Sequence, residues 1–180
     1  MKQILSKSIV LIGLMGSGKS AVGKMLSEAI EVPFSDTDNL IEKEVGKKIY
    51  QIFDDYGEGY FRQVEEKVVG KTLEDTAHII STGGGSIVSP KIRKLIKVKS
   101  FSIWIQCDLN IIAKRILNQR NRPLLKNRNI LDVLIENNED RIKFYSEADV
   151  HVKNENPNLE LAVEGIIRSL FVNKVMKNND

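Results

Sequence analysis

The stretch that limits the possible folds most strongly lies near the start of the chain, at residues 13–20, with the sequence GLMGSGKS. It follows an apolar run at 9–12 and precedes a segment in which apolar residues recur at helical spacing. A strand, a glycine-rich turn and a helix in this order are the context that the phosphate-binding pattern G-x-x-x-x-G-K-[ST] requires. An ordinary glycine-rich turn is the alternative, but every fixed position of the pattern is filled. The sequence therefore predicts a nucleoside triphosphate site.

Each part of this turn has a chemical task. Backbone N–H groups that glycines leave accessible surround phosphate oxygens, and the start of the following helix adds positive potential. We expect Lys19 to reach the β- and γ-phosphates and the Ser20 hydroxyl to coordinate Mg²⁺. The residues predicted to bind the nucleotide in this stretch are Gly16, Ser17, Gly18, Lys19, Ser20 and Ala21.

Apolar runs typical of strands alternate along the chain with helical patterns. The predicted strands cover residues 9–12, 31–34, 77–81, 101–106 and 149–152. The predicted helices follow the phosphate loop, cover 39–45, 49–56 and 58–74, begin at Pro90 and after Asp108, and cover 130–148 and 159–170. This alternation predicts a parallel sheet with helices on both faces, a three-layer α/β fold. No linker or repeat divides residues 1–180, so we expect one domain whose last few residues fray.

The composition excludes several classes of protein. A net charge of +3 over 180 residues, without a basic tail or lysine run, gives no reason to expect a nucleic-acid partner. No window approaches the roughly 20 consecutive apolar residues of a membrane span, and the start of the chain does not read as a signal peptide. The single cysteine, Cys107, excludes an internal disulfide and suits a reducing compartment. We expect a cytoplasmic protein without a membrane partner.

Two acids, Asp36 and Asp38, follow the second predicted strand. Because they are two residues apart, their side chains point the same way if the segment is extended. One carboxylate facing a Mg²⁺ on Ser20 and the other facing an acceptor hydroxyl is an arrangement suited to phosphoryl transfer. The alternative is that either acid caps the following helix.

Arg62 and Glu65 are three residues apart and share one face of a predicted helix. One interpretation is a surface ion pair worth a few tenths of a kcal/mol. The other is a receptor for a substrate carboxylate, in which Glu65 orients the guanidinium, because the planar fork of arginine matches a carboxylate. The local sequence does not choose between them.

The glycine triplet at 83–85 follows a predicted buried strand. Glycine loses more conformational entropy on folding than other residues, so three in a row indicate that another group approaches the backbone closely here. A flexible turn is the alternative.

Three arginines, Arg115, Arg120 and Arg122, lie in or beside a polar stretch at 118–129, which is either a solvated loop or a lid over the nucleotide. Arg141 either faces the acceptor or pairs with a neighbouring acid.

Taken together and in order, these motifs resemble those of the shikimate kinase family, and the likeness covers essentially the whole chain. The matching segments are 13–20, D-x-D-x-x-I-E at 36–42, G-E-x-x-F-R-x-x-E at 57–65, the glycines at 83–85, R-P-L-L at 122–125 and R-x-x-x-Y at 141–145. The resemblance implies ATP-dependent phosphorylation of the 3-hydroxyl of shikimate, a step toward chorismate and the aromatic amino acids. It also implies a P-loop kinase fold with a five-stranded parallel sheet in the order 2-3-1-4-5, a substrate-binding helical insert at about 37–74 and a lid at about 116–129.

The same resemblance implies a role for each matching residue. Shikimate would be held by Asp38, Arg62, Gly83, Gly84, Gly85 and Arg141. Mg²⁺ would be served by Ser20 and Asp36, adenine by Arg115, and the phosphates by the lid residue Arg122. The predicted catalytic residues are Lys19, Asp38 and Arg122. The expected partners are shikimate and Mg-ATP, bound by a monomer.

Two positions depart from the family pattern, and one other function stays open. Glu155 stands in an adenine-contacting turn where arginine is frequent, and Lys143 stands where proline is frequent. The alternative function is that of another small-metabolite P-loop kinase, such as a gluconate kinase-like enzyme, because its acceptors also carry a carboxylate. A GTPase switch is disfavoured, since Met176 follows Asn173-Lys174 where the guanine-reading pattern Asn-Lys-x-Asp has its acid.

Overall fold

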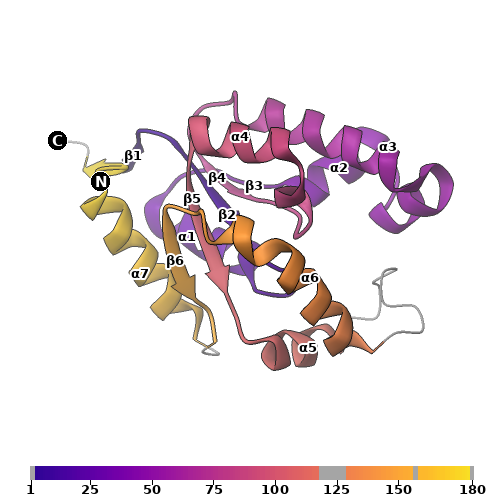
Figure 1. The fold of residues 1–180 in the computed structure, drawn as a ribbon. Helices are drawn as coiled ribbons and strands as arrows, with labels where there is room; N and C mark the ends of the chain where they lie inside the picture. The colour runs from indigo at the N-terminus through magenta and orange to yellow at the C-terminus, as the bar shows by residue number, and fades with distance from the viewer. Residues whose placement is uncertain (1–2, 118–128, 156–157, 179–180) are drawn as a thin grey trace.

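The computed structural model describes residues 3–117, 129–155 and 158–178 and is built on a five-stranded parallel sheet (Figure 1). The strands, in spatial order, are β3 (Phe34–Asp36), β4 (Ile79–Ser81), β2 (Ser8–Ile12), β5 (Ser100–Gln106) and β6 (Val150–Lys153). In chain order of the five strands this is 2-3-1-4-5, so the predicted sheet is confirmed. Its order changes direction at β2, and in such sheets ligands bind beyond the carboxyl ends of the strands at that point.

Side chains alternate between two buried faces of this sheet, as the strand period requires. In β2, Ile9 and Leu11 pack in one cluster with α1 (Lys19–Ile30) and α7 (Leu159–Val172). Val10 and Ile12 pack in the other cluster, on the opposite face. The helices of that face are α4 (Pro90–Lys99), α5 (Leu109–Leu117) and α6 (Ile130–Tyr145), joined by the end of α3 (Ile49–Thr72) through Val69. These layers confirm the predicted three-layer α/β architecture.

Helices α2 (Thr37–Val45) and α3 (Ile49–Thr72) stand outside the strict alternation and extend to one side of the molecule (Figure 1). They share a small core of their own, in which Ile41 and Ile52 are fully buried. Gly57 interrupts α3 with φ 78° and ψ 171°, a conformation that favours glycine. The break predicted at Gly57 is therefore present, and it redirects the second half of α3 toward the sheet.

Two predictions about local structure are wrong. The segment at 31–34 is not a strand, because Glu31 ends α1 in a left-handed conformation and β3 begins only at Phe34. The last few residues are predicted to fray, but β7 (Met176–Asn178) pairs antiparallel with β1 (Gln3–Leu5) in a separate two-stranded sheet. Residues 179–180 lie outside the described residues. A strand of three residues shows too few alternating positions to be recognised in the sequence, and its partner strand is distant along the chain.

In the described part of the chain, no helix is long and apolar enough to cross a bilayer.

Candidate active site

The phosphate loop connects β2 to α1 and depends on glycines in unusual backbone conformations. Gly13, Gly16 and Gly18 have φ values of 141°, 75° and 97°, which other residues rarely adopt. Lys19 is the first residue of α1, and its buried Nζ donates to the carbonyl oxygens of Gly13 and Leu14, each at 2.8 Å. Its positive charge thus lies against the loop whose N–H groups are suited to phosphate oxygens.

Three side chains with oxygen atoms meet beside the start of α1. The Ser20 hydroxyl donates to Asp36 Oδ2 at 2.6 Å, and its oxygen lies 3.3 Å from Ser81 Oγ. Hydroxyl and carboxylate oxygens are the hard ligands that Mg²⁺ prefers, so Ser20 and Asp36 fit the predicted metal site. The described residues hold no group of three or more His, Cys, Asp or Glu side chains suited to a metal ion. A Mg²⁺ here would therefore take further ligands from phosphates and water.

A cavity of about 610 Å³ lies between the phosphate loop and the α2–α3 insert. We call it the acceptor cavity, because it is lined by residues predicted to bind the phosphate acceptor, among them Asp38, Arg62 and Arg141. Its charged lining residues are Asp38, Glu42, Lys48, Arg62, Glu65 and Arg141. Its apolar and aromatic lining residues are Met15, Ile49, Tyr50, Phe53 and Phe61. A cavity with cations at two sides and an apolar wall suits a small ring that carries an acid and hydroxyl groups.

Asp36 and Asp38 do not share one extended segment, so the prediction that they point the same way is wrong. β3 ends at Asp36, and Asp38 lies in the first turn of α2. Asp36 Oδ1 accepts the backbone N–H of Asp38 at 3.0 Å, while its other oxygen accepts from Ser20. Asp36 therefore caps the helix and also contacts Ser20 at the predicted metal site, and the helical turn directs Asp38 to the acceptor cavity.

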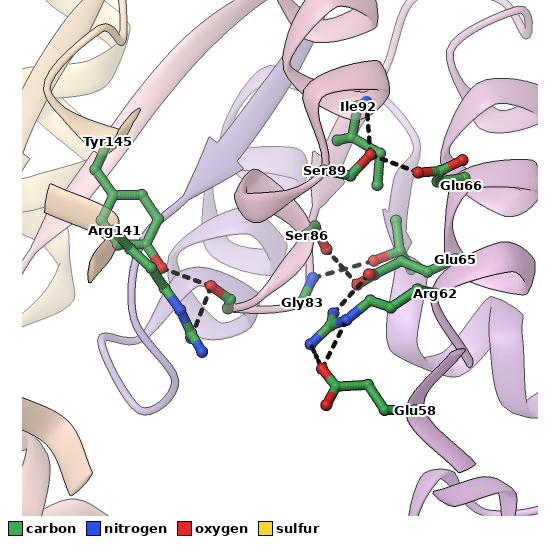
Figure 2. Close-up of polar contacts among 12 residues, drawn as sticks. Glu58, Arg62, Glu65, Glu66, Gly83, Ser86, Ser89, Ile92, Arg141 and Tyr145 are labelled. Atoms are coloured by element: carbon green, nitrogen blue, oxygen red, sulfur yellow. Dashed lines mark hydrogen bonds and ion pairs between the residues drawn. The ribbon is translucent and has the colours of Figure 1, made fainter. Parts of the chain in front are cut away.

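Arg62 lies at the centre of a charged network on the insert side of the acceptor cavity (Figure 2). Its Nη1 donates to Glu65 Oε2 at 2.7 Å, and its Nε and Nη2 donate to Glu58 Oε1 at 3.2 and 3.0 Å. Glu65 is 1% exposed and also accepts from the Ser86 hydroxyl. Burial alone would lower the pKa of Arg62, but Glu65 and Glu58 outweigh it and raise that pKa. The guanidinium is held charged and oriented, as the receptor interpretation requires.

Arg141 reaches the opposite side of the acceptor cavity from α6. Its Nη1 donates to the Gly84 carbonyl at 3.3 Å, and the Tyr145 hydroxyl donates to the same carbonyl at 2.6 Å (Figure 2). Tyr145 is 1% exposed, and burial raises its pKa to about 12 although Arg141 lowers it. The neutral tyrosine thus anchors the glycine turn to α6. Of the two placements open for Arg141, the structure has the one that faces the cavity.

The glycine triplet makes three separate close approaches. A Cβ on Gly83 would lie 2.8 Å from Asp38 Oδ1, and one on Gly84 would lie 2.8 Å from the backbone nitrogen of Met15. A Cβ on Gly85 would lie 2.7 Å from Nη2 of Arg62. Each distance is shorter than real Cβ contacts allow. The absence of side chains at the triplet therefore lets the phosphate loop, α2 and α3 pack against this turn. This favours the close-approach interpretation over that of a flexible turn.

Known proteins are similar to this chain in both sequence and structure. The family model described as shikimate kinase matches residues 15–171. A shikimate kinase from Caulobacter vibrioides is 40% identical over 165 residues, covering 92% of this chain and 82% of that protein. The solved shikimate kinase from Acinetobacter baumannii in complex with shikimate has a TM-score of 0.90 at 29% identity, covering 94% of this chain and 95% of its own. The chain belongs to the shikimate kinase family.

A second solved structure supports the same assignment. The shikimate kinase from Aquifex aeolicus is 38% identical, with a TM-score of 0.81, and the match covers 93% of this chain and 98% of that one. Membership of the shikimate kinase family makes the chain a small-molecule kinase. It also confirms the P-loop kinase fold inferred from the order of the motifs.

Arg115, the residue predicted to contact adenine, lies against the phosphate loop, where its Nη1 donates to the Ser17 carbonyl at 3.5 Å. Its Nη2 donates to the Asn154 carbonyl at 3.2 Å, and its Nη1 lies 3.3 Å from Cys107 Sγ. Burial raises the pKa of Cys107, although Arg115 opposes this, so the thiol stays protonated. Arg122, the predicted lid arginine, and most of the predicted lid at 116–129 lie outside the described residues. Only its ends are seen, in α5 and in Asn129, which caps α6.

Sequence reasoning missed two polar residues at this edge of the sheet. Asn154 is 2% exposed, and its Nδ2 donates to the Ser17 carbonyl at 2.7 Å while its backbone N–H donates to Gln106. It thus joins β5 and β6 to the phosphate loop. Ser81 is the other, through its contact with Ser20. The available signal was positional, because each is a polar residue at the carboxyl end of a strand.

Proposed function

We propose that this chain transfers the γ-phosphoryl group of ATP to the 3-hydroxyl of shikimate. The observation that carries the proposal is the placement of Arg62 and Arg141 around one cavity that adjoins the phosphate loop. Arginine binds carboxylates through paired, charge-assisted hydrogen bonds. A ring acid fits between these cations and the apolar wall of the cavity, and its hydroxyl can face Asp38.

The acceptor side of this proposal works by positioning. Arg62 and Arg141 bind the shikimate carboxylate, while Asp38 accepts a hydrogen bond from the 3-hydroxyl and directs its oxygen at the γ-phosphorus. Phosphoryl transfer passes through a loose transition state with little bond formation to the nucleophile, so orientation and charge stabilisation contribute most. Gly83 and Gly85 permit this arrangement, because their lack of a Cβ lets Asp38 and Arg62 approach the turn.

The donor side places positive charge on the transferring group. The backbone N–H groups of the phosphate loop and Lys19 bind the β- and γ-phosphates, and Ser20 with Asp36 would hold Mg²⁺. When bound, Mg²⁺ neutralises charge on the β- and γ-oxygens. The proposal assigns contact with the nucleotide base to Arg115 and additional positive charge on the phosphates to Arg122. We further propose that the enzyme acts as a monomer in the cytoplasm.

The test is an ADP-release assay with Mg-ATP and one of three solutions: shikimate, gluconate or no acceptor. We expect ADP release with shikimate well above the other two, and loss of that release in Lys19→Ala. Equal or faster release with gluconate would support the gluconate kinase-like alternative. No shikimate-dependent release from a folded preparation would overturn the proposed function.

A further inference from the structure

The network around Arg62 carries more negative charge than is expected for a site that binds a carboxylate. One guanidinium faces two carboxylates, Glu58 and Glu65, so the group of three carries a net negative charge. A substrate carboxylate that approached Arg62 with both in place would be a third negative charge, and like charges at contact distance repel. At least one of the two glutamates must therefore move for Arg62 to bind an acid tightly.

The two glutamates differ in how firmly they are held. The side chain of Glu65 is 1% exposed, and it accepts from both Arg62 and Ser86. The side chain of Glu58 is 64% exposed, and within the described part of the chain its ion pair and side-chain hydrogen bonds are those with Arg62. Glu58 also directly follows the break at Gly57, at the start of a helical segment, where a carboxylate is favoured without any partner. Glu58 is thus the carboxylate that leaves at low cost.

The geometry of Arg62 shows which edge a ligand can use. A guanidinium offers two edges that match a carboxylate, one at Nε and Nη2 and one between the two Nη atoms. The position of a Cβ on Gly85 lies 2.7, 2.9 and 3.2 Å from Nη2, Nη1 and Cζ, which places it in front of the edge between the Nη atoms. The backbone of Gly85 therefore faces that edge. The remaining edge, at Nε and Nη2, is the one that Glu58 occupies.

We propose that Glu58 is an internal competitor for the substrate carboxylate. It occupies the Nε and Nη2 edge of Arg62 in the unliganded enzyme, and it leaves that edge when a carboxylate ligand binds. Its effect is to weaken binding of every carboxylate that takes this edge by the same factor. An acid that also contacts Asp38 and Arg141 still binds strongly enough to displace it. The proposal rests on the proposed function only in naming shikimate as that acid.

The experiment is calorimetric titration of the full chain, without ATP, using shikimate and, separately, benzoate as a simple ring carboxylate. The variants are Glu58→Gln, which keeps size and removes charge, and Glu58→Ala. Exposed ion pairs contribute up to about 1 kcal/mol, so we expect both variants to bind each acid about two- to fivefold more tightly. Glu74→Gln is the matched control, since its side chain is 69% exposed and its ion pair with Lys99 lies outside the acceptor cavity. It should bind like the wild type.

Two results would overturn the proposal, and both separate it from the proposed function. If Glu58 served only to position Arg62, Glu58→Ala would bind both acids more weakly than the wild type. Unchanged affinities in both variants would equally rule out competition. Failure of the wild type to bind shikimate would count against the proposed function alone, because tighter benzoate binding by Glu58→Gln would still support the competitor role.

Discussion

The predicted nucleotide site lies mainly in one continuous stretch of eight residues, 13–20. On the acceptor side, the cavity draws on α2, α3, the turn after β4 and α6, which lie far apart in the sequence. The first region is held by glycine backbone angles and by Lys19. The second is held by a charged network in which Arg62 and Glu65 fix one another.

This difference implies different responses to substitution. A change in the phosphate loop should reduce phosphoryl transfer without affecting how the acceptor is held. A change in the charged network should weaken acceptor binding without affecting the nucleotide. The two regions touch at Gly84, whose backbone packs on Met15 and whose carbonyl accepts from Arg141 and Tyr145. Gly84 is therefore the position where the separation should fail.

The largest effect is expected from Lys19→Ala. Removing a charge placed on the transferring group typically costs about 10²–10³-fold in turnover, and the loss of two hydrogen bonds to the loop adds to it. Binding of shikimate in the absence of nucleotide should stay at the wild-type level. Steady-state rates and calorimetry check the two parts, and a matching loss of shikimate affinity would show that the regions are not separate.

Arg62→Ala should give the opposite pattern. Loss of charged hydrogen bonds corresponds to about 1.5–3 kcal/mol, so we expect KM for shikimate to rise by about 10- to 100-fold. KM for ATP should change little. The exposed Arg168 on α7 provides the control, Arg168→Ala, which should behave as wild type. An unchanged KM for shikimate in Arg62→Ala would contradict the carboxylate assignment.

Gly84→Ala should break the separation. Its Cβ would meet backbone rather than a movable side chain, and overpacking of this kind costs about 1–3 kcal/mol. We expect KM for both ATP and shikimate to rise, each by about tenfold. Gly59→Ala is the matched control, because nothing lies within 4 Å of a Cβ at Gly59. If only one KM rose in Gly84→Ala, the two regions would be coupled elsewhere.

Tyr145→Phe should have the smallest effect, mainly on stability. Loss of the hydrogen bond to Gly84 should cost about 1 kcal/mol of unfolding free energy at neutral pH. The raised pKa of Tyr145, about 12, means that the folded state keeps a proton that the unfolded state loses above a pH of about 10. Stability should therefore fall between about pH 10 and 12 in the wild type, and less in Tyr145→Phe. Chemical denaturation across this range measures the difference, and parallel pH curves would contradict it.

The two regions also differ in how far the sequence predicts them. The phosphate loop is contiguous, so residue spacing alone fixes which backbone groups and which lysine come together. The sequence predicts that something approaches the backbone of the glycine triplet closely, but it does not predict which residues do so. The neighbours are distant in sequence: Gly83 lies against Asp38, and Gly85 lies against Arg62. The helical pattern around Arg141 is compatible both with a side chain that faces the acceptor and with one that pairs with a neighbouring acid. Only the packing of α6 in the folded structure distinguishes the two.

The wrongly predicted boundaries of the second strand and of the helix after it also changed the expected arrangement of the site. Because β3 ends at Asp36 and α2 begins at once, the side chain of Asp36 contacts Ser20 while that of Asp38 lines the acceptor cavity. In one extended segment the two side chains would point the same way. The roles of Ser81 and Asn154 depend on neighbouring strands that bring them to the loop. Such roles arise from tertiary contacts, which local propensity does not encode.

The most direct test of the account is to identify the product. The wild-type chain would be incubated with shikimate and Mg-ATP, and the phosphate ester located by phosphorus–proton correlation in the NMR spectrum. The account predicts one ester, on the 3-oxygen of shikimate, formed in step with ADP. ADP without an ester, or an ester on another oxygen, would contradict the placement of the acceptor by Asp38, Arg62 and Arg141.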